Sequence, residues 1–252
     1  MSSSRIHEDV DGSFDAILSV LSKIIEIPSV LDASVLDKNA HPFGARVTEA
    51  LDKFLGEAKS LGFATSNIDN MVGYAEIGEG PLFGILAHLD VMPVGALANW
   101  RYPPFRATVE NGRLYGRGAI DDKGPAVSAM FAMKALADSG VKLKRRFRLI
   151  LGLDEESGFR CIERYKKTEE IPAMSFSPDS DFPVVNAEKG ILHFVLAKKI
   201  SNMDAMGLPE LVDIRGGDRF NIVPDELDVF FRRASAGNLD LVLKPIGAQV
   251  TT

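Results

Sequence analysis

Cysteine is almost absent from the 252-residue sequence, which contains only Cys161. The chain therefore cannot form an internal disulfide bond or build a zinc site from several thiolates. No run approaches the roughly 20 uncharged apolar residues that a membrane-spanning helix requires. The first residues are polar and acidic, unlike the basic start and apolar middle of a secretory signal. These absences predict a soluble, cytoplasmic protein that does not insert into a membrane.

Basic residues are fewer than acidic ones. The sequence has 29 lysines and arginines against 35 aspartates and glutamates, a net charge of −6 and a pI of about 5.3. One basic cluster, at residues 142–148, has no interleaved aromatic residues of the kind that stack on bases, so we interpret it as a solvated connection. The composition argues against a nucleic-acid-binding protein.

The pattern of apolar residues predicts an α/β protein. Apolar residues recur at helical spacing in three segments, namely 14–25, 45–61 and 125–138. Short apolar runs predict strands at 71–77, 82–87, 147–153 and 173–177, the first two as neighbours. Asn111-Gly112 predicts a tight hairpin between residues 107–110 and 113–115. Helices that alternate with apolar strands favour a layered sheet.

The pattern changes near residue 190. Beyond it, the predicted strands are separated only by loops, at 191–200, 211–214 and 226–231. We therefore predict a first domain at residues 1–189 and a second, smaller one at 190–252. This agrees with a length typical of one to two domains.

Acidic residues and one histidine follow the ends of the predicted strands. They are His88 and Asp90 after the second strand, Asp154, Glu155 and Glu156 after the third, and Asp179 and Asp181 after the fourth. Asp121 and Asp122 lie in a glycine-rich loop before a helix. The carboxyl ends of strands are where open α/β sheets bind ligands.

So many carboxylates at one edge predict a multivalent cation, because unpaired buried charges are costly. An imidazole with carboxylates suits zinc best, with manganese or cobalt as relatives. Asp90 lies two residues after His88, on the same side of an extended segment, and can reach the ring nitrogen that does not bind metal. Asp121 could bridge two ions. One of Glu155 and Glu156 can bind metal while the other faces a nucleophilic water.

Each motif alone has an ordinary explanation. A His-x-Asp triplet is usually incidental, Asp-Glu-Glu often begins a solvated helix, and Asp-Asp-Lys-Gly is commonly a turn. Their joint occurrence at strand ends is what favours a metal site.

Four ordered motifs resemble a known family. They are HLDVMPVG from residue 88, Trp100 followed by PPF from residue 103, YGRGAIDDKGP from residue 115 and DEESG from residue 154. Together they resemble the zinc-dependent aminoacylase, desuccinylase and carboxypeptidase G family of metallopeptidases. The later SPDSDFPVVNAEKG, from residue 177, is similar to dipeptidases of the peptidase V type. The resemblance, over about residues 14–231, implies a three-layer αβα catalytic domain followed by a smaller α+β lid domain, and hydrolysis of small peptides.

The resemblance also implies roles for individual residues. His88 and Asp179 would bind the first zinc ion, Glu156 the second, and Asp121 both. A cis peptide bond often follows the bridging aspartate. Glu155 would be the general base and Asp90 would orient His88. In the lid domain, Asn221 would reach toward the substrate.

The chain departs from the family in one respect. The family's catalytic domain resumes after the lid and supplies a last zinc-binding histidine, which none of His7, His41 and His193 matches. We therefore expect this chain to cover about the N-terminal half of such an enzyme and to be inactive alone. An N-acyl amino acid deacylase and a metal-binding remnant without catalysis remain alternatives, and the oligomeric state is open.

Overall fold

The computed structural model describes residues 3–32, 34, 40–181, 183–190, 192, 194–195, 209–217 and 227–232. The chain divides into two compact units, Met1–Val185 and Asn186–Thr252. Their identification as a catalytic domain and a lid domain stays a prediction.

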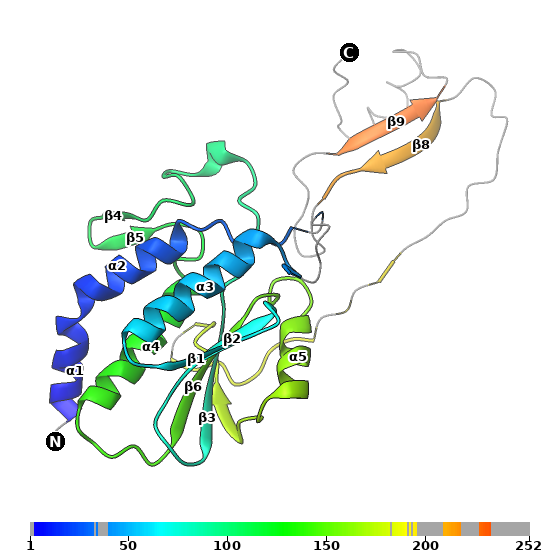
Figure 1. The fold of residues 1–252 in the computed structure, drawn as a ribbon. Coiled ribbons are helices and arrows are strands. Elements are labelled where there is room, and N and C mark those ends of the chain that lie inside the picture. The colour runs from blue at the N-terminus through cyan, green and yellow to red at the C-terminus, as the bar shows by residue number, and fades with distance from the viewer. Residues whose placement is uncertain are drawn as a thin grey trace. The chain divides into compact units, whose positions relative to one another are not determined.

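A five-stranded mixed sheet forms the centre of the first unit (Figure 1). Its spatial order is β1 (Ala64–Ile68), β2 (Val72–Ile77), β6 (Arg146–Gly152), β3 (Leu82–His88) and β7 (Met174–Phe176). The first three strands pair antiparallel, whereas β6, β3 and β7 run parallel to one another. The carboxyl ends of β6, β3 and β7 therefore lie at one edge of the sheet.

Helices cover both faces of this sheet. The helices are α1 (Ser3–Gly12), α2 (Phe14–Ile25), α3 (Ala45–Ser60), α4 (Lys123–Asp138), α5 (Arg160–Thr168) and the short 3₁₀ helix η1 (Leu97–Asn99). A Cβ atom at Gly73 would meet Leu51 of α3, and one at Gly152 would meet Cys161 of α5. Gly152 pairs with the residue before Gly73, so the two glycines face opposite sides. Since α3 and α5 lie on these opposite faces, the predicted three-layer αβα arrangement is confirmed.

The predicted pairing of the segments 71–77 and 82–87 is wrong. Both are strands, but β6 lies between them. Five successive buried residues make β6 a central strand that needs a partner on each edge. The connection from β2 to β3 passes over the start of β6, and a Cβ atom at Gly78 would lie 2.7 Å from the Arg145 carbonyl oxygen. Glycine there lets the connection cross a strand.

The predicted helices at 14–25, 45–61 and 125–138 are present as α2, α3 and α4. The hairpin of β4 (Thr108–Glu110) and β5 (Arg113–Tyr115) is also present, with Asn111 and Gly112 both at positive φ. The strand β1 and the helices α1 and α5 were not predicted. Asp69 and Asn70, both at positive φ, form the turn between β1 and β2.

In the second unit, β8 (Glu210–Arg215) pairs antiparallel with β9 (Asp228–Arg232). Most of the predicted strand 191–200, together with His193 and Asn221, falls outside the described residues. Among the described helices, none combines the length and the apolar character needed to cross a membrane.

Candidate metal centre

Three parallel strands bring the candidate residues to one edge of the sheet. His88 ends β3 and pairs with Gly152, the last residue of β6, so the segment with Glu155 and Glu156 begins beside it. On the other side, the Ser177 hydroxyl donates to the Leu86 carbonyl at 2.8 Å and holds the segment that leads to Asp179. The parallel pairing thus explains why residues far apart in sequence meet here.

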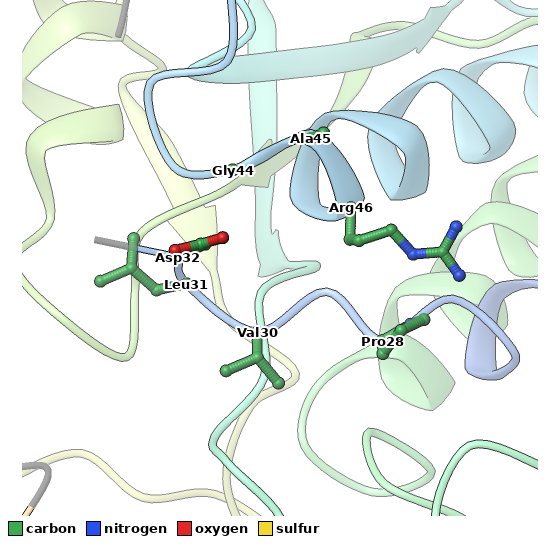
Figure 2. Close-up of a pocket in the computed structure, with 7 residues that line it drawn as sticks. All are labelled: Pro28, Val30, Leu31, Asp32, Gly44, Ala45 and Arg46. Carbon is green, nitrogen blue, oxygen red and sulfur yellow. The ribbon is translucent and has the colours of Figure 1, made fainter. Parts of the chain in front are cut away.

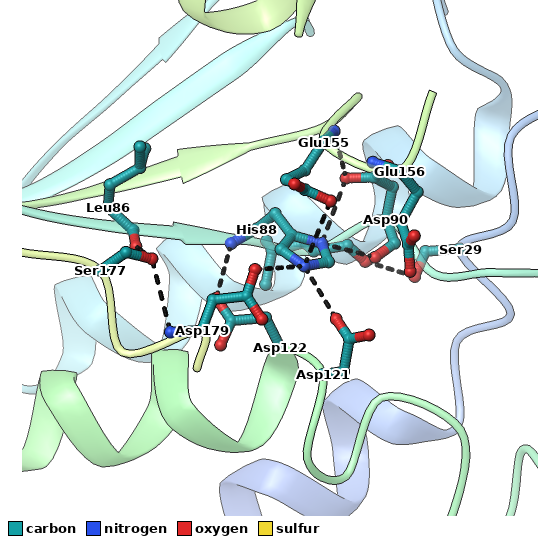
Figure 3. Close-up of polar contacts among 11 residues, drawn as sticks. Ser29, Leu86, His88, Asp90, Asp121, Asp122, Glu155, Glu156, Ser177 and Asp179 are labelled. Atoms are coloured by element: carbon teal, nitrogen blue, oxygen red, sulfur yellow. Dashed lines mark hydrogen bonds and ion pairs between the residues drawn. The ribbon is translucent and has the colours of Figure 1, made fainter. Parts of the chain in front are cut away.

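The buried imidazole of His88 is the centre of the cluster (Figure 3). Its Nε2 lies 3.0 Å from Asp121 Oδ1, 3.4 Å from Asp179 Oδ2 and 3.9 Å from Glu155 Oε2. Its Nδ1 lies 2.9 Å from the carbonyl oxygen of Asp90. Because a carbonyl oxygen only accepts, Nδ1 is the protonated donor and Nε2 is the nitrogen presented to the carboxylates.

Asp90 does more than face the imidazole. Its carboxylate lies 3.5 Å from His88 Nδ1, which is longer than the contact made by its own carbonyl. Its two carboxylate oxygens instead accept the backbone N–H groups of Glu155 and Glu156, each at 3.1 Å. Asp90 is 1% exposed. It therefore ties the end of β3 to the segment that carries both glutamates.

The loop before α4 contributes Asp121 and Asp122, joined by a cis peptide bond. Asp121 is half exposed. Asp122 is fully buried and accepts the backbone N–H of His88 at 3.0 Å through Oδ2. Its other oxygen, Oδ1, is buried with no hydrogen-bond partner among the described residues. The sequence placed Asp122 among the acidic residues but gave it no role.

Lys123, which the sequence analysis also missed, anchors this loop to the end of α2. Its side chain is completely buried, and Nζ donates to the carbonyl oxygens of Ile24 at 2.9 Å and Ile27 at 2.7 Å. These carbonyls lie at and just beyond the C-terminal end of α2. An apolar pattern cannot reveal such a lysine, because the sequence does not show that carbonyl groups will surround it.

The protonation equilibria reflect a crowded, partly desolvated site. Burial lowers the pKa of His88, but the hydrogen bonds that its ring donates to the carboxylates of Asp121, Asp179 and Asp90 outweigh burial and raise that pKa far above its usual range. Burial raises the pKa of Asp122 to about 7 and that of Glu156 to about 7. Burial also raises the pKa of Glu155. The carboxylates together favour a positive charge at His88 Nε2.

These side chains fit a divalent cation. One ligand atom from each of His88, Asp122 and Asp179 can be chosen so that all lie within 4.8 Å of one another. One of these residues, Asp122, carries the buried oxygen that has no hydrogen-bond partner among the described residues. An imidazole with several carboxylates is a donor set that zinc, manganese and cobalt accept. Of the sequence-predicted site residues, only Asn221 falls outside the described part of the chain.

A separate pocket of about 390 Å³ lies at the start of α3 (Figure 2). The described residues that line it are Pro28, Val30, Leu31, Asp32, Gly44, Ala45 and Arg46. They include none of the candidate metal ligands. Its cation, Arg46, forms an ion pair with Glu49. The pocket therefore does not form part of the metal centre.

The chain is similar to several known proteins. The chain is 43% identical over 204 residues to the Bacillus subtilis (strain 168) protein named "Putative dipeptidase YtjP", covering 81% of this chain and 43% of that one. It thus spans less than half the length of this relative. Among solved structures, the di-peptidase Dug1p of Saccharomyces cerevisiae matches with a TM-score of 0.55 and 22% identity, over 65% of this chain and 37% of that one.

A second solved structure is the M20 family metallo-carboxypeptidase Sso-CP2 of Sulfolobus solfataricus. It matches with a TM-score of 0.52 and 26% identity, over 64% of this chain and 37% of that one. The model of peptidase family M20/M25/M40 matches residues 84–222, more than half of the chain, and this segment begins within β3 and includes every predicted ligand. The chain is therefore a member of peptidase family M20/M25/M40.

Proposed function

We propose that this chain carries the metal-binding part of a dinuclear zinc dipeptidase of the peptidase V type. One observation carries the proposal. The Nε2 atom of His88 faces carboxylates from three separate segments, those of Asp121, Asp179 and Glu155. The 43% sequence identity to a protein named as a putative dipeptidase supports a small peptide as the substrate.

The ligand roles in this proposal follow the family resemblance. His88 and Asp179 serve one zinc ion, Glu156 serves the other, and Asp121, through its two carboxylate oxygens, serves both. The half-exposed side chain of Asp121 suits a residue at the mouth of a site that a substrate must reach. Asp90 stays out of the ligand set because its oxygens already accept two backbone N–H groups.

Glu155 is the general base in the proposed reaction. Bound zinc would supply a water whose pKa falls from about 15.7 to about 7. The Glu155 carboxylate takes a proton from the attacking water while the oxygen of that water bonds to the peptide carbon. The same proton then passes to the amide nitrogen as the C–N bond breaks, which gives a carboxylic acid and an amine. Burial raises the pKa of Glu155, and a raised pKa suits a carboxylate that must accept and return a proton.

The whole activity requires more ligands than these residues provide. In the proposed set, the second ion has only Asp121 and Glu156, whereas a catalytic zinc usually has three protein ligands. We therefore expect the 252-residue chain alone to bind the second ion weakly and to hydrolyse dipeptides slowly or not at all. For the whole protein we propose a cytoplasmic location, with neither nucleic acid nor membrane as a partner.

Zinc counting together with a substrate panel tests the proposal. Elemental analysis of the purified chain should find bound zinc, and Asp121→Ala should lose it because a bridging ligand serves both ions. A longer protein that contains this chain should cleave dipeptides faster than N-acetyl amino acids. The opposite preference would indicate a deacylase, and bound zinc with no turnover on either would indicate a metal-binding remnant. Unchanged zinc in Asp121→Ala would contradict the bridging role.

A further inference from the structure

The two glutamates of the metal centre lie on an irregular segment between β6 and α5. This segment contains Asp154, whose side chain is completely buried. The Asp154 carbonyl oxygen accepts N–H groups from Gly158 at 3.1 Å and Phe159 at 2.8 Å. The segment therefore closes on itself, with Glu155 and Glu156 inside the closed turn.

Arg160, the first residue of α5, holds the buried carboxylate of Asp154. Its Nε lies 2.7 Å from Oδ2 and its second terminal nitrogen 2.9 Å from Oδ1, so the contact is two-pronged. The backbone N–H of Arg160 also donates to Oδ2, at 3.1 Å. The guanidinium lies over the ring of buried Phe43, 4.8 Å from its centroid. Four contacts thus fix the position of one arginine.

The backbone has an uncommon conformation at the residue before Arg160. Phe159 has a φ of +57°, in the left-handed region that residues with a Cβ atom rarely occupy. Phe159 precedes α5 directly and its carbonyl oxygen accepts N–H groups from Ile162 and Glu163. The conformation turns the chain so that the side chain of Arg160 can point back to Asp154.

We propose that Arg160 is a positioning residue for the two glutamates. It acts through Asp154 on one side of the segment, while Asp90 holds the N–H groups of Glu155 and Glu156 on the other. Both contacts act on the backbone of the segment and not on the glutamate side chains. The significance for metal binding rests on the proposed function, whereas the restraint on the backbone does not.

The same helix offers a matched control. Arg164, one turn later in α5, also forms an ion pair, with Asp69 at 2.6 Å. Asp69 is 56% exposed, whereas Asp154, the partner of Arg160, is fully buried, and neither Arg164 nor Asp69 adjoins the glutamate segment. Removing either arginine deletes one positive charge from α5. A difference between the two variants therefore reports the contact of Arg160 with Asp154 and not the loss of charge.

The test compares Arg160→Met, Arg160→Lys and Arg164→Met in the 252-residue chain. Amide hydrogen exchange of the metal-free protein reports on the backbone, and titration with Zn²⁺ alone reports on the site. In Arg160→Met we expect faster exchange at Glu155 and Glu156 and zinc affinity lower by about 10–100-fold, the usual effect of losing an outer-shell partner. Arg160→Lys keeps the charge but loses the two-pronged contact, so a smaller change in the same direction is expected. Arg164→Met should match the parent chain in both measurements.

The outcomes separate the two proposals. Exchange that rises only within α5, or not at all, would show that Arg160 merely stabilises the helix, and would overturn the inference. Faster exchange at the two glutamates in a chain that binds no zinc even before substitution would support the restraint and overturn the proposed function. Should Arg160→Met fail to fold, as judged by circular dichroism, Arg160→Lys supplies the same comparison.

Discussion

Replacing Asp90 by asparagine tests the connection between β3 and the glutamate segment. Asparagine has nearly the same shape but only one acceptor oxygen, so one of the two N–H groups now bonded at 3.1 Å would face an NH₂ group. Hydrogen bonds to a charged group contribute about 1.5–3 kcal/mol, and a buried donor without a partner costs about 1–3 kcal/mol. Because Asp90 is 1% exposed, water cannot replace the lost acceptor. We expect Asp90→Asn to lower the free energy of unfolding by about 2–4 kcal/mol.

Urea denaturation followed by circular dichroism, with a chelator present, measures this change without a contribution from metal. Asp52→Asn is the control, since Asp52 is exposed and accepts a 3.3 Å hydrogen bond from Asn67. Its effect should stay within about 0.5 kcal/mol, as for other surface substitutions. If Asp90→Asn changed the free energy of unfolding no more than Asp52→Asn does, the carboxylate would not hold the segment and the reasoning would be refuted.

Three further predictions concern the loop before α4 and the titration of the site. Lys123→Met should lower the free energy of unfolding by about 2 kcal/mol, because two carbonyl groups each lose one hydrogen bond from a charged donor, whereas Lys134→Met in the same helix should change it little. Gly118→Ala should cost about 1–3 kcal/mol in the same assay, since φ is +82° and the new Cβ would lie 2.8 Å from the Lys123 side chain. The raised pKa of Glu156, about 7, means that its carboxyl is mostly protonated at about pH 6 and ionised at about pH 8. Zinc binding should therefore be tighter at about pH 8 and should release more protons at about pH 6. Calorimetry in buffers of different ionisation enthalpy measures this release, and equal proton release at both pH values would contradict the raised pKa.

Much of the fold could be predicted because its central segments have clear periodicity. The helices α2, α3 and α4 and the strands β3 and β6 are strongly apolar on their buried sides. In contrast, β1 is a short edge strand with one buried residue, and α5 buries only Cys161 and Tyr165. A weak apolar pattern leaves little to recognise, although Asp69-Asn70 was an available turn signal for β1.

Strand order was harder to predict than strand existence. Nothing in residues 71–87 indicates that a segment some sixty residues later will insert between the two strands. For the site, the rule that ligands gather at the carboxyl ends of strands brought the right segments together. It could not reveal which atoms pair, and so missed Lys123, Arg160 and the use of both Asp90 oxygens by backbone N–H groups.

The parallel pairing of β3 with β6 and β7 has a consequence for biosynthesis. Ser177, which secures the segment of Asp179, contacts Leu86 across 91 residues of sequence. At a translation rate of about 5–20 residues per second, the ribosome needs about 5–20 s to make the intervening chain. The β1–β2 hairpin can close during that time, since its partners are adjacent, but His88 has to wait for both parallel neighbours. A nascent chain thus presents an isolated imidazole, and the proposed metal site can form only after the sheet has closed.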